Sequence, residues 1–434
     1  MIFRTLPYFH AGFLVCVIII ACLCIRLRLS VLRSMTFLLN LLFLFVYYLP
    51  YYTLKIPLLP ESQHVIVIGH FMMNLGLLVG FLIADALVPA ESPTPPKLLN
   101  IEVPERGFLI IMFVTGICGY SILYATRGIP LLSHDIDIAR EDFISGAGVI
   151  TWPSTILINS AIWSLCVRKY YRLSMAFCFL GGTFFLMSGW RGQLVLTVIP
   201  IFYICTYQRK VTWKLLLAGL ASLCIFALFG LFRTNASGYS LYGLMLKSGM
   251  NLREYPLMIY LYLINRFGEH AINFDIAVSY FSGNLLGGKG MLMDFSFLLP
   301  GSNMTVGAFM KEMFGKWEGG GGMPITMLGG FYADFGAWGI ILISFLAAAF
   351  HAILVRTLQK LSKVSNLTVM LLGYANAFWV LGFLGSYFRD FLPQALVYSA
   401  GIWMTFLTCH MMNRGATQFA GDSEHANRHY HCNA

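Results

Sequence analysis

The chain has 434 residues, a formal net charge of +10 and a mean hydropathy of +0.73, with 58% hydrophobic and only 11% charged residues. The core of a soluble protein does not need that much apolar surface, so the composition predicts a membrane protein with many spans. In such a protein, excess positive charge is typical of cytoplasmic loops that face anionic lipid. We therefore do not expect nucleic-acid binding.

Eleven apolar runs predict membrane-spanning helices, although several are short for the roughly 20 residues that a span requires. Helices are expected throughout, because an open sheet leaves backbone polar groups unsatisfied in lipid. The first run lacks a cleavage-type site and is followed by arginines, so we expect it to be retained. The predicted spans are 9–25, 35–53, 64–84, 107–125, 149–166, 173–188, 193–207, 214–231, 337–355, 367–386 and 393–411.

Charge in the gaps between these runs predicts the orientation. The short gaps that contain arginine and lysine but no acidic residue are 26–34, 167–172, 208–214 and 356–366. With eleven spans these gaps all fall on one side, together with the C-terminal tail, and the positive-inside rule assigns that side to the cytoplasm. The N-terminus is then expected on the outer side.

This topology divides the chain into four parts. A membrane domain, 1–231, would hold eight helices and an outer loop at 126–148. The outer segment 232–336 is too long for a plain connection, and its short apolar pieces suggest interfacial helices. Three further spans would lie in 337–412. The polar tail, 413–434, is expected to be cytoplasmic and disordered.

Arginines on the predicted outer side are the first candidates for function. A guanidinium group binds phosphate or carboxylate through two parallel hydrogen bonds and keeps its charge, so a converging set predicts an anionic substrate. The alternative is that each arginine anchors the chain at the membrane surface or pairs with an acid, as Arg389 could with Asp390. The candidates are Arg140, Arg191, Arg266, Arg389, Arg127 and Arg233.

A general base must reach a hydroxyl group and have a suitable pKa. The leading candidates are Glu269, His270, Asp334 and Asp142, and the weaker ones are Glu141, Asp275, Asp294 and His134. Glu269 and His270 follow Arg266 closely, which places a cation, an acid and an imidazole within five residues. Solvated loop charges or structural ion pairs remain the alternative for each of them.

Aromatic residues near the outer loops could stack on sugar rings, although most aromatic residues in membrane proteins form interfacial belts. The candidates for stacking are Trp190, Trp317 and Tyr332. The cysteines lie mostly in apolar runs, so neither a disulfide framework nor a metal site is expected. The sequence has no GxxxxGK[ST], GxSxG or HExxH motif.

Three segments resemble a known family. RGIPLLSHDIDIAR (127–140), MSGWRGQL (187–194) and PITMLGGFYADFGAWG (324–339) are similar to recurring segments of bacterial O-antigen polymerases of the Wzy type, also called oligosaccharide repeat unit polymerases. By this resemblance Arg140 matches the arginine after GIPLL, Arg191 the arginine of the SG-x-RG turn, and Asp334 the acid of YADFG. The long outer segment before the last three spans is also similar.

The resemblance implies an all-α, GT-C-like membrane glycosyltransferase in the bacterial inner membrane, with its active site facing the periplasm. Its donor and acceptor would both be undecaprenyl-pyrophosphate-linked oligosaccharides, and a chain-length regulator protein would be a partner alongside the membrane lipids. No cofactor or metal is implied. Two alternatives stay open: an O-antigen ligase, which shares the long outer segment, and a flippase, which usually shows internal repeats that we do not find here.

Overall fold

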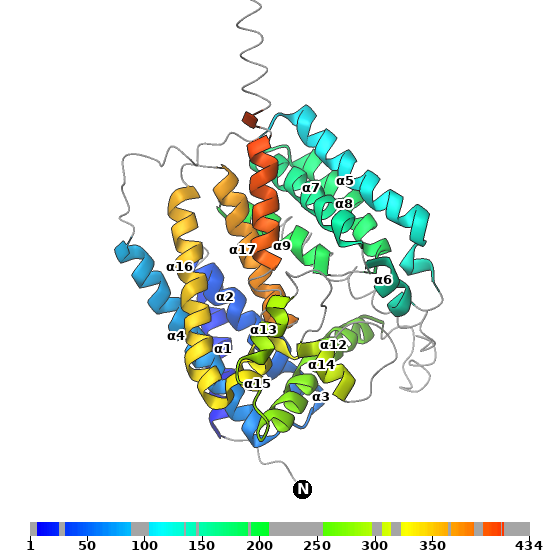
Figure 1. The fold of residues 1–434 in the computed structure, drawn as a ribbon. Coiled ribbons are helices and arrows are strands. Elements are labelled where there is room, and N and C mark those ends of the chain that lie inside the picture. Colours follow the sequence, from blue (N-terminus) through cyan, green and yellow to red (C-terminus); the bar gives the residue numbers. More distant parts are fainter. Residues whose placement is uncertain are drawn as a thin grey trace, which may run out of the picture.

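The computed structural model describes residues 7–25, 31–87, 104–133, 136–144, 147–189, 192–207, 255–296, 306–313, 323–362, 366–385, 394–408 and 410–411. Within these ranges the chain forms helices and no strands (Figure 1). Six segments are long and apolar enough to cross a membrane: Met35–Leu54, Pro60–Leu87, Arg106–Leu132, Gly148–Val167, Thr326–Lys360 and Asn366–Leu384. The prediction of an all-α membrane protein is confirmed at this level.

Helices occupy each predicted span that falls among the described residues, while the predicted span 214–231 lies outside them. These helices are α1 (Pro7–Ile25), α2 (Val31–Phe43) with η1 (Leu44–Tyr48) and α3 (Leu49–Leu54), α4 (Pro60–Leu87), α5 (Arg106–Arg127), α7 (Gly148–Val167), α8 (Tyr171–Met187), α9 (Gly192–Tyr207), α15 (Thr326–Trp338) with η5 (Gly339–Ile343) and α16 (Ser344–Ser362), α17 (Asn366–Leu384) and a last helix at 394–408.

The remaining helices belong to the segments predicted as outer loops. They are η3 (Pro130–Leu132), α6 (Ile136–Ile144), α12 (Tyr255–Phe281), α13 (Lys289–Ser296) and α14 (Val306–Met313). In Figure 1 they lie in the lower half of the molecule, at the same end as the N-terminus. Their placement on the outer side of a membrane stays a prediction.

Helix α12 is longer than its predicted apolar piece, 256–264. The polar residues after 264 do not end the helix, because apolar side chains continue at helical spacing. Ala271, Phe274 and Val278 are all buried against the neighbouring helices. Burial of this stripe, rather than uniform apolarity, extends the helix through the Glu269–His270 pair.

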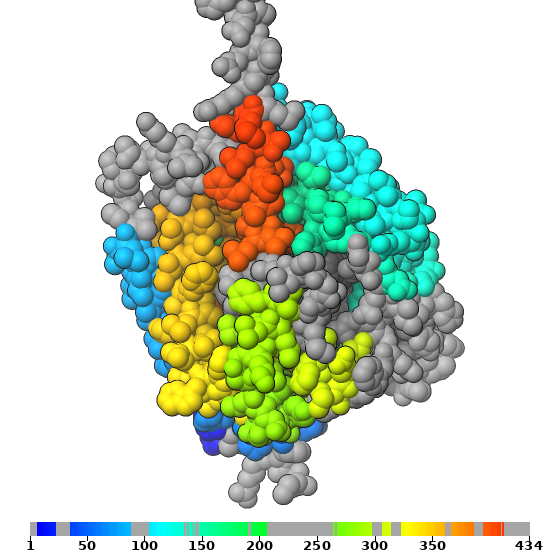
Figure 2. Space-filling model, viewed as in Figure 1, coloured from blue at the N-terminus to red at the C-terminus, as the bar shows by residue number. Residues whose placement is uncertain are grey.

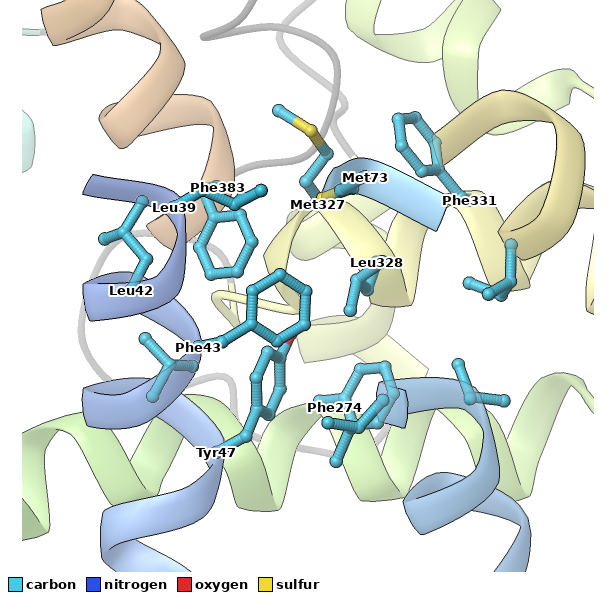
Figure 3. Close-up of a cluster of buried hydrophobic side chains, with 14 of the residues drawn as sticks. Leu39, Leu42, Phe43, Tyr47, Met73, Phe274, Met327, Leu328, Phe331 and Phe383 are labelled. Carbon is cyan, nitrogen blue, oxygen red and sulfur yellow. The ribbon is translucent and has the colours of Figure 1, made fainter. Parts of the chain in front are cut away.

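The described helices bury two hydrophobic cores. The first joins α1–α4 with α12, α15 and α16, and its centre contains Tyr47, Phe274 and Phe331 (Figure 3). The second joins α5, α7, α8 and α9 with the helix 394–408. Helix α17 contributes to both, since Phe383 belongs to the first core and Phe378 to the second. It therefore stands between the two halves.

Helices α4 and α16 approach closely through small residues. A Cβ atom on Gly76 would lie 2.4 Å from the carbonyl oxygen of Phe345, and one on Gly80 would lie 2.3 Å from that of Ala349. Glycines four residues apart let two backbones meet in this way inside a membrane. These contacts fix α16 and hence the segment α15 that precedes it.

One face of the molecule presents apolar side chains beside the outer-segment helices. Figure 2 shows α16 in yellow and the helix 394–408 in red on this face, with the lime-green segment that contains α13 below the red helix. Leu292 on α13 and Met404 on the last helix are both exposed. Such a surface suits contact with lipid chains.

Candidate functional site

The YADFG segment breaks α15 and anchors the outer segment to it. Gly336 has φ +61° and ψ −141°, a conformation that interrupts the helix and favours glycine. The break leaves carbonyl groups without their helical partners. The backbone N–H groups of Leu286 and Gly287 donate to the carbonyl oxygens of Ala333 and Asp334, both at 2.9 Å. The loop before α13 thus satisfies the end of α15.

The Asp334 carboxylate caps α13 from across the fold. Its side chain is 1% exposed, and its two oxygens accept hydrogen bonds from the backbone N–H of Gly290 at 2.8 Å and of Met291 at 2.9 Å. A carboxylate at a helix N-terminus satisfies free amide groups and opposes the positive end of the helix dipole. A general-base role for Asp334 stays a prediction, and it would require a proton to reach oxygens that backbone amides already occupy.

Tyr332, two residues before Asp334, ties α15 to the start of α4. Its hydroxyl group donates a hydrogen bond to the carboxylate of Glu61, and its side chain is 5% exposed. Its role in sugar stacking stays a prediction, which in this structure would need the ring to be uncovered. Its hydrogen bond to Glu61 is a structural contact.

Asp275 ties α12 to the same region. Its carboxylate accepts a hydrogen bond of 2.9 Å from the backbone N–H of Leu59, just before α4. Burial raises the pKa of this carboxyl above its ordinary value of 3.8. Together with Tyr332 and Asp334, it makes the junction of α4, α12, α13 and α15 a firmly connected platform.

The predicted base candidates Glu269 and His270 lie on α12, and both are half-buried. His270 is on the helical stripe of Phe267 and Phe274, whose ring centroids lie 5.7 Å from Phe45 and 5.2 Å from Tyr47 respectively. The backbone of Arg266 is one turn before His270, as the sequence predicted, while the side chain of Arg266 is outside the described atoms.

Arg127 has a structural role in the first outer loop. Its Nη1 donates hydrogen bonds to the carbonyl oxygens of Asp142 at 3.0 Å and Phe143 at 3.1 Å, at the C-terminal end of α6. A cation there satisfies free carbonyl groups and the negative end of the helix dipole. Asp142 is exposed. The predicted substrate roles of Arg127 and Asp142 stay predictions.

Arg140 is held against the turn that leads to Arg191. A Cβ atom built on Gly189 would lie 3.6 Å from Cδ of Arg140 and 3.5 Å from Cγ2 of Ile136, and Gly189 has φ +73°. Gly189, at the end of α8, therefore packs on α6 at ordinary van der Waals distance. Two of the segments that carry the family resemblance, 127–140 and 187–194, are neighbours in space.

Gln193, just after Arg191, is a residue that sequence reasoning missed. Its side chain is 2% exposed, and its Oε1 accepts a hydrogen bond of 2.5 Å from the Tyr120 hydroxyl group on α5. Tyr120 also hydrogen-bonds Thr155 on α7 at 2.8 Å. A glutamine at the start of an otherwise apolar predicted span was the available signal.

The C-terminal end of α17 connects this turn with α12. A Cβ atom on Gly192 would lie 3.7 Å from Cδ2 of Leu381. Two residues on, the ring of Phe383 is 6.2 Å from that of Tyr47, which in turn is 5.2 Å from Phe274 of α12. The end of α17 therefore packs against Tyr47 of η1, which in turn packs against α12.

We call this region the arginine junction. It comprises Arg140 on α6, Gly189 and Gly192 at the two ends of the α8–α9 turn, and Leu381 near the end of α17. Arg389 follows the end of α17 by a few residues in the sequence. The predicted residues outside the described part of the chain are Arg191, Arg233, Arg389, Trp190 and Trp317.

Within the described ranges, no group of three or more His, Cys, Asp and Glu side chains is placed to hold a metal ion. Comparison of the chain with models of known protein families, with curated protein sequences and with solved structures found no match.

Proposed function

We propose that the protein is an O-antigen or related polysaccharide polymerase. It transfers a growing undecaprenyl-pyrophosphate-linked glycan onto the non-reducing end of a new lipid-linked repeat unit. The observation that carries this proposal is the arginine junction, where Gly189 packs against Arg140 and Gly192 packs against Leu381 of α17. A diphosphate needs several cations at one place, and these separate segments supply them.

The proposed chemistry follows from the charges at the junction. The acceptor hydroxyl oxygen attacks the anomeric carbon of the donor, the bond from that carbon to the pyrophosphate oxygen breaks, and undecaprenyl pyrophosphate leaves. Negative charge grows on the leaving group, and fixed guanidinium groups stabilise it where water is excluded. Arg140 and Arg191 have the leading role in this proposal, and Arg266 and Arg389 are further candidates.

A general base takes the proton of the acceptor hydroxyl. Glu269 and His270 suit this role best, because they are half-buried on α12 and follow Arg266 closely in the sequence. Asp334 has a structural role in this proposal, because its carboxylate caps α13. A diphosphate is a good leaving group, so loss of the base is expected to slow the reaction less than loss of an arginine.

The proposed topology places this chemistry on the periplasmic side of the bacterial inner membrane. Eleven spans put the basic gaps on the cytoplasmic side and the helices α6 and α12–α14 on the other. Apolar side chains beside α13, such as exposed Leu292, would admit the polyprenyl chains from the lipid phase. A chain-length regulator protein is the expected partner.

The proposal is tested by the surface lipopolysaccharide of a strain that lacks the gene, with and without a plasmid copy. A polymerase predicts that the ladder on a gel collapses to core plus a single repeat, because one unit is still flipped and attached. Bare core with accumulated lipid-linked polymer would indicate a ligase instead. Bare core with single units retained on the cytoplasmic side would indicate a flippase.

A further inference from the structure

The start of α5 and the turn between α7 and α8 lie together at one end of the helices. Arg106 is the first residue of α5, and its guanidinium carbon lies 5.7 Å from the centre of the Tyr170 ring in the turn. A cation over an aromatic ring at this distance is attracted to it. The candidate span Arg106–Leu132 begins here and Gly148–Val167 ends here, so a bilayer that contains them has its surface at this level.

Positive charge gathers in this region. The stretches 104–108 and 166–174 contain four cationic residues and one acidic residue, Glu105. The four are Arg106, Arg168, Lys169 and Arg172, and we call them the basic turn cluster. Arg168 is partly exposed, and the other three are exposed. The region therefore presents a net positive surface at the level where lipid headgroups lie.

Two of these cations lie at helix N-termini, where the helix dipole opposes them. Arg106 is in the first turn of α5 and Arg172 in the first turn of α8, and neither turn contains an acidic residue. The N-terminal end of a helix carries partial positive charge, which favours anions. Arg168 differs, because the C-terminal end of α7 favours a cation. The charges of Arg106 and Arg172 are therefore not explained by the helices that carry them.

Lys169 occupies a backbone position that favours glycine. Its φ is +67°, in the left-handed region. The backbone N–H of Tyr170 donates to the carbonyl oxygen of Leu165 at 2.9 Å, and that of Lys169 to the carbonyl oxygen of Cys166 at 3.1 Å. This pair of bonds is the Schellman motif that ends a helix, usually with glycine at the left-handed residue. A lysine in this strained position indicates that its ammonium group has a role which the turn itself does not require.

The turn is also fixed to the helices on both sides. The hydroxyl group of Ser174 on α8 donates a hydrogen bond of 2.9 Å to the carbonyl oxygen of Ile162 on α7. The backbone N–H of Ser174 donates to the carbonyl oxygen of Tyr170 at 2.9 Å. The backbone that carries Lys169 and Arg172 is thus held in place before any ligand binds, which lowers the entropy cost of binding.

We infer that the basic turn cluster binds the phosphodiester headgroup of an anionic phospholipid. The oxygens of a phosphodiester accept charge-assisted hydrogen bonds from guanidinium and ammonium groups. Cations at a membrane surface attract such headgroups, and Tyr170, which is 43% exposed, is an aromatic residue suited to the same level. This site is separate from the proposed catalytic site, and the inference does not depend on the proposed function.

The test measures lipid affinity by native mass spectrometry of the purified full-length protein in detergent. Phosphatidylglycerol is the anionic probe, and phosphatidylcholine is the reference without net charge. Lys169→Gly removes the ammonium group and relaxes the backbone, so its melting temperature should equal or exceed that of the wild type. We expect its affinity for phosphatidylglycerol to fall about fivefold, since one cation near a membrane surface contributes about 1 kcal/mol. A triple variant that adds Arg106→Gln and Arg172→Gln should lose about 100-fold.

Lys55→Gly is the matched control. Lys55 is also exposed and has φ +52° at the end of α3, but no other lysine or arginine occurs between positions 34 and 96. The control therefore loses the same charge and a similar backbone strain without touching the basic turn cluster. It should keep the wild-type affinity for phosphatidylglycerol.

Three results would overturn the inference. The first is equal affinity of the wild type for phosphatidylglycerol and phosphatidylcholine. The second is wild-type affinity for phosphatidylglycerol in Lys169→Gly, which decides the question even if the triple variant fails to fold. The third is an equal loss in Lys55→Gly, because binding would then follow net charge alone. The melting temperature in detergent establishes that each variant is folded.

Discussion

Asp334→Asn should release the segment that follows the break in α15. In the wild type both carboxylate oxygens accept backbone N–H groups, from Gly290 at 2.8 Å and from Met291 at 2.9 Å. An asparagine keeps one acceptor oxygen and turns an NH₂ group toward the other amide, so one charge-assisted hydrogen bond is lost. That loss should cost about 1.5–3 kcal/mol of local stability.

Hydrogen–deuterium exchange of peptides covering 286–296 measures this effect directly. Since about 1.4 kcal/mol corresponds to a factor of ten, exchange should become roughly 10- to 100-fold faster in the variant. Asp85→Asn is the control. Asp85 is a partly exposed acid near the C-terminal end of α4, where its carboxylate pairs with Arg356 at 2.7 Å and with Lys360 at 3.1 Å. The control should leave exchange at 286–296 unchanged.

Wild-type exchange at 286–296 in Asp334→Asn would refute the capping argument. If the same variant also lost polymer formation, Asp334 would act in the chemistry, as the general base that its sequence position suggested. Fast exchange with partial polymer formation would instead agree with a supporting role.

Three further changes test other parts of the structure. Gly336→Ala places a side chain on a residue with φ +61° and ψ −141° and should destabilise the protein by about 1–3 kcal/mol, as measured by thermal unfolding in detergent. Gly107→Ala is the control: an added Cβ atom there meets nothing within 4 Å, so this variant should keep the stability of the wild type. Burial raises the pKa of Asp275 in the folded protein above its ordinary value of 3.8. The protonated carboxyl therefore favours the folded state at pH values below 3.8, and this contribution to stability is lost as the pH rises through the folded-state pKa. Asparagine has no charge to bury, so the melting temperature of Asp275→Asn should rise relative to that of the wild type as the pH increases from 3.8 to neutrality. A difference in melting temperature that does not change with pH would contradict the assignment. Arg140→Ala should lower the polymerisation rate about 100-fold or more, the usual loss when one donor to a developing anion is removed. Arg356→Ala, near the opposite end of the fold, is the control and should give polymer of wild-type length. Equal losses in the two variants would contradict the arginine junction.

Much of the helical framework could be predicted from the sequence because lipid imposes simple rules. A span must be apolar and helical, so runs such as 149–166 and 367–386 were found nearly at their observed limits, α7 (Gly148–Val167) and α17 (Asn366–Leu384). Helix α12 was recognised only in part. Its polar residues occupy one face, and its continuation depends on burial that no local window reveals.

The site residues were harder to predict, since their partners are distant in the chain. Asp334 was predicted as a candidate general base, but its partners are 43 and 44 residues away, so capping could not be distinguished from catalysis. Gln193 meets Tyr120 across 73 residues. Nothing in a single sequence shows that Gly192 packs against Leu381 of α17, or that Phe383 packs against Tyr47.

The most direct test of the central claim is elongation by the purified protein in liposomes supplied with the undecaprenyl-pyrophosphate-linked repeat unit. We predict a ladder of longer lipid-linked glycans with release of undecaprenyl pyrophosphate, and the loss of that ladder in Arg191→Ala protein that folds and inserts normally. If the wild-type protein leaves the repeat unit unextended, or if Arg191→Ala gives the full ladder, the account of the arginine junction as a polymerase site is wrong.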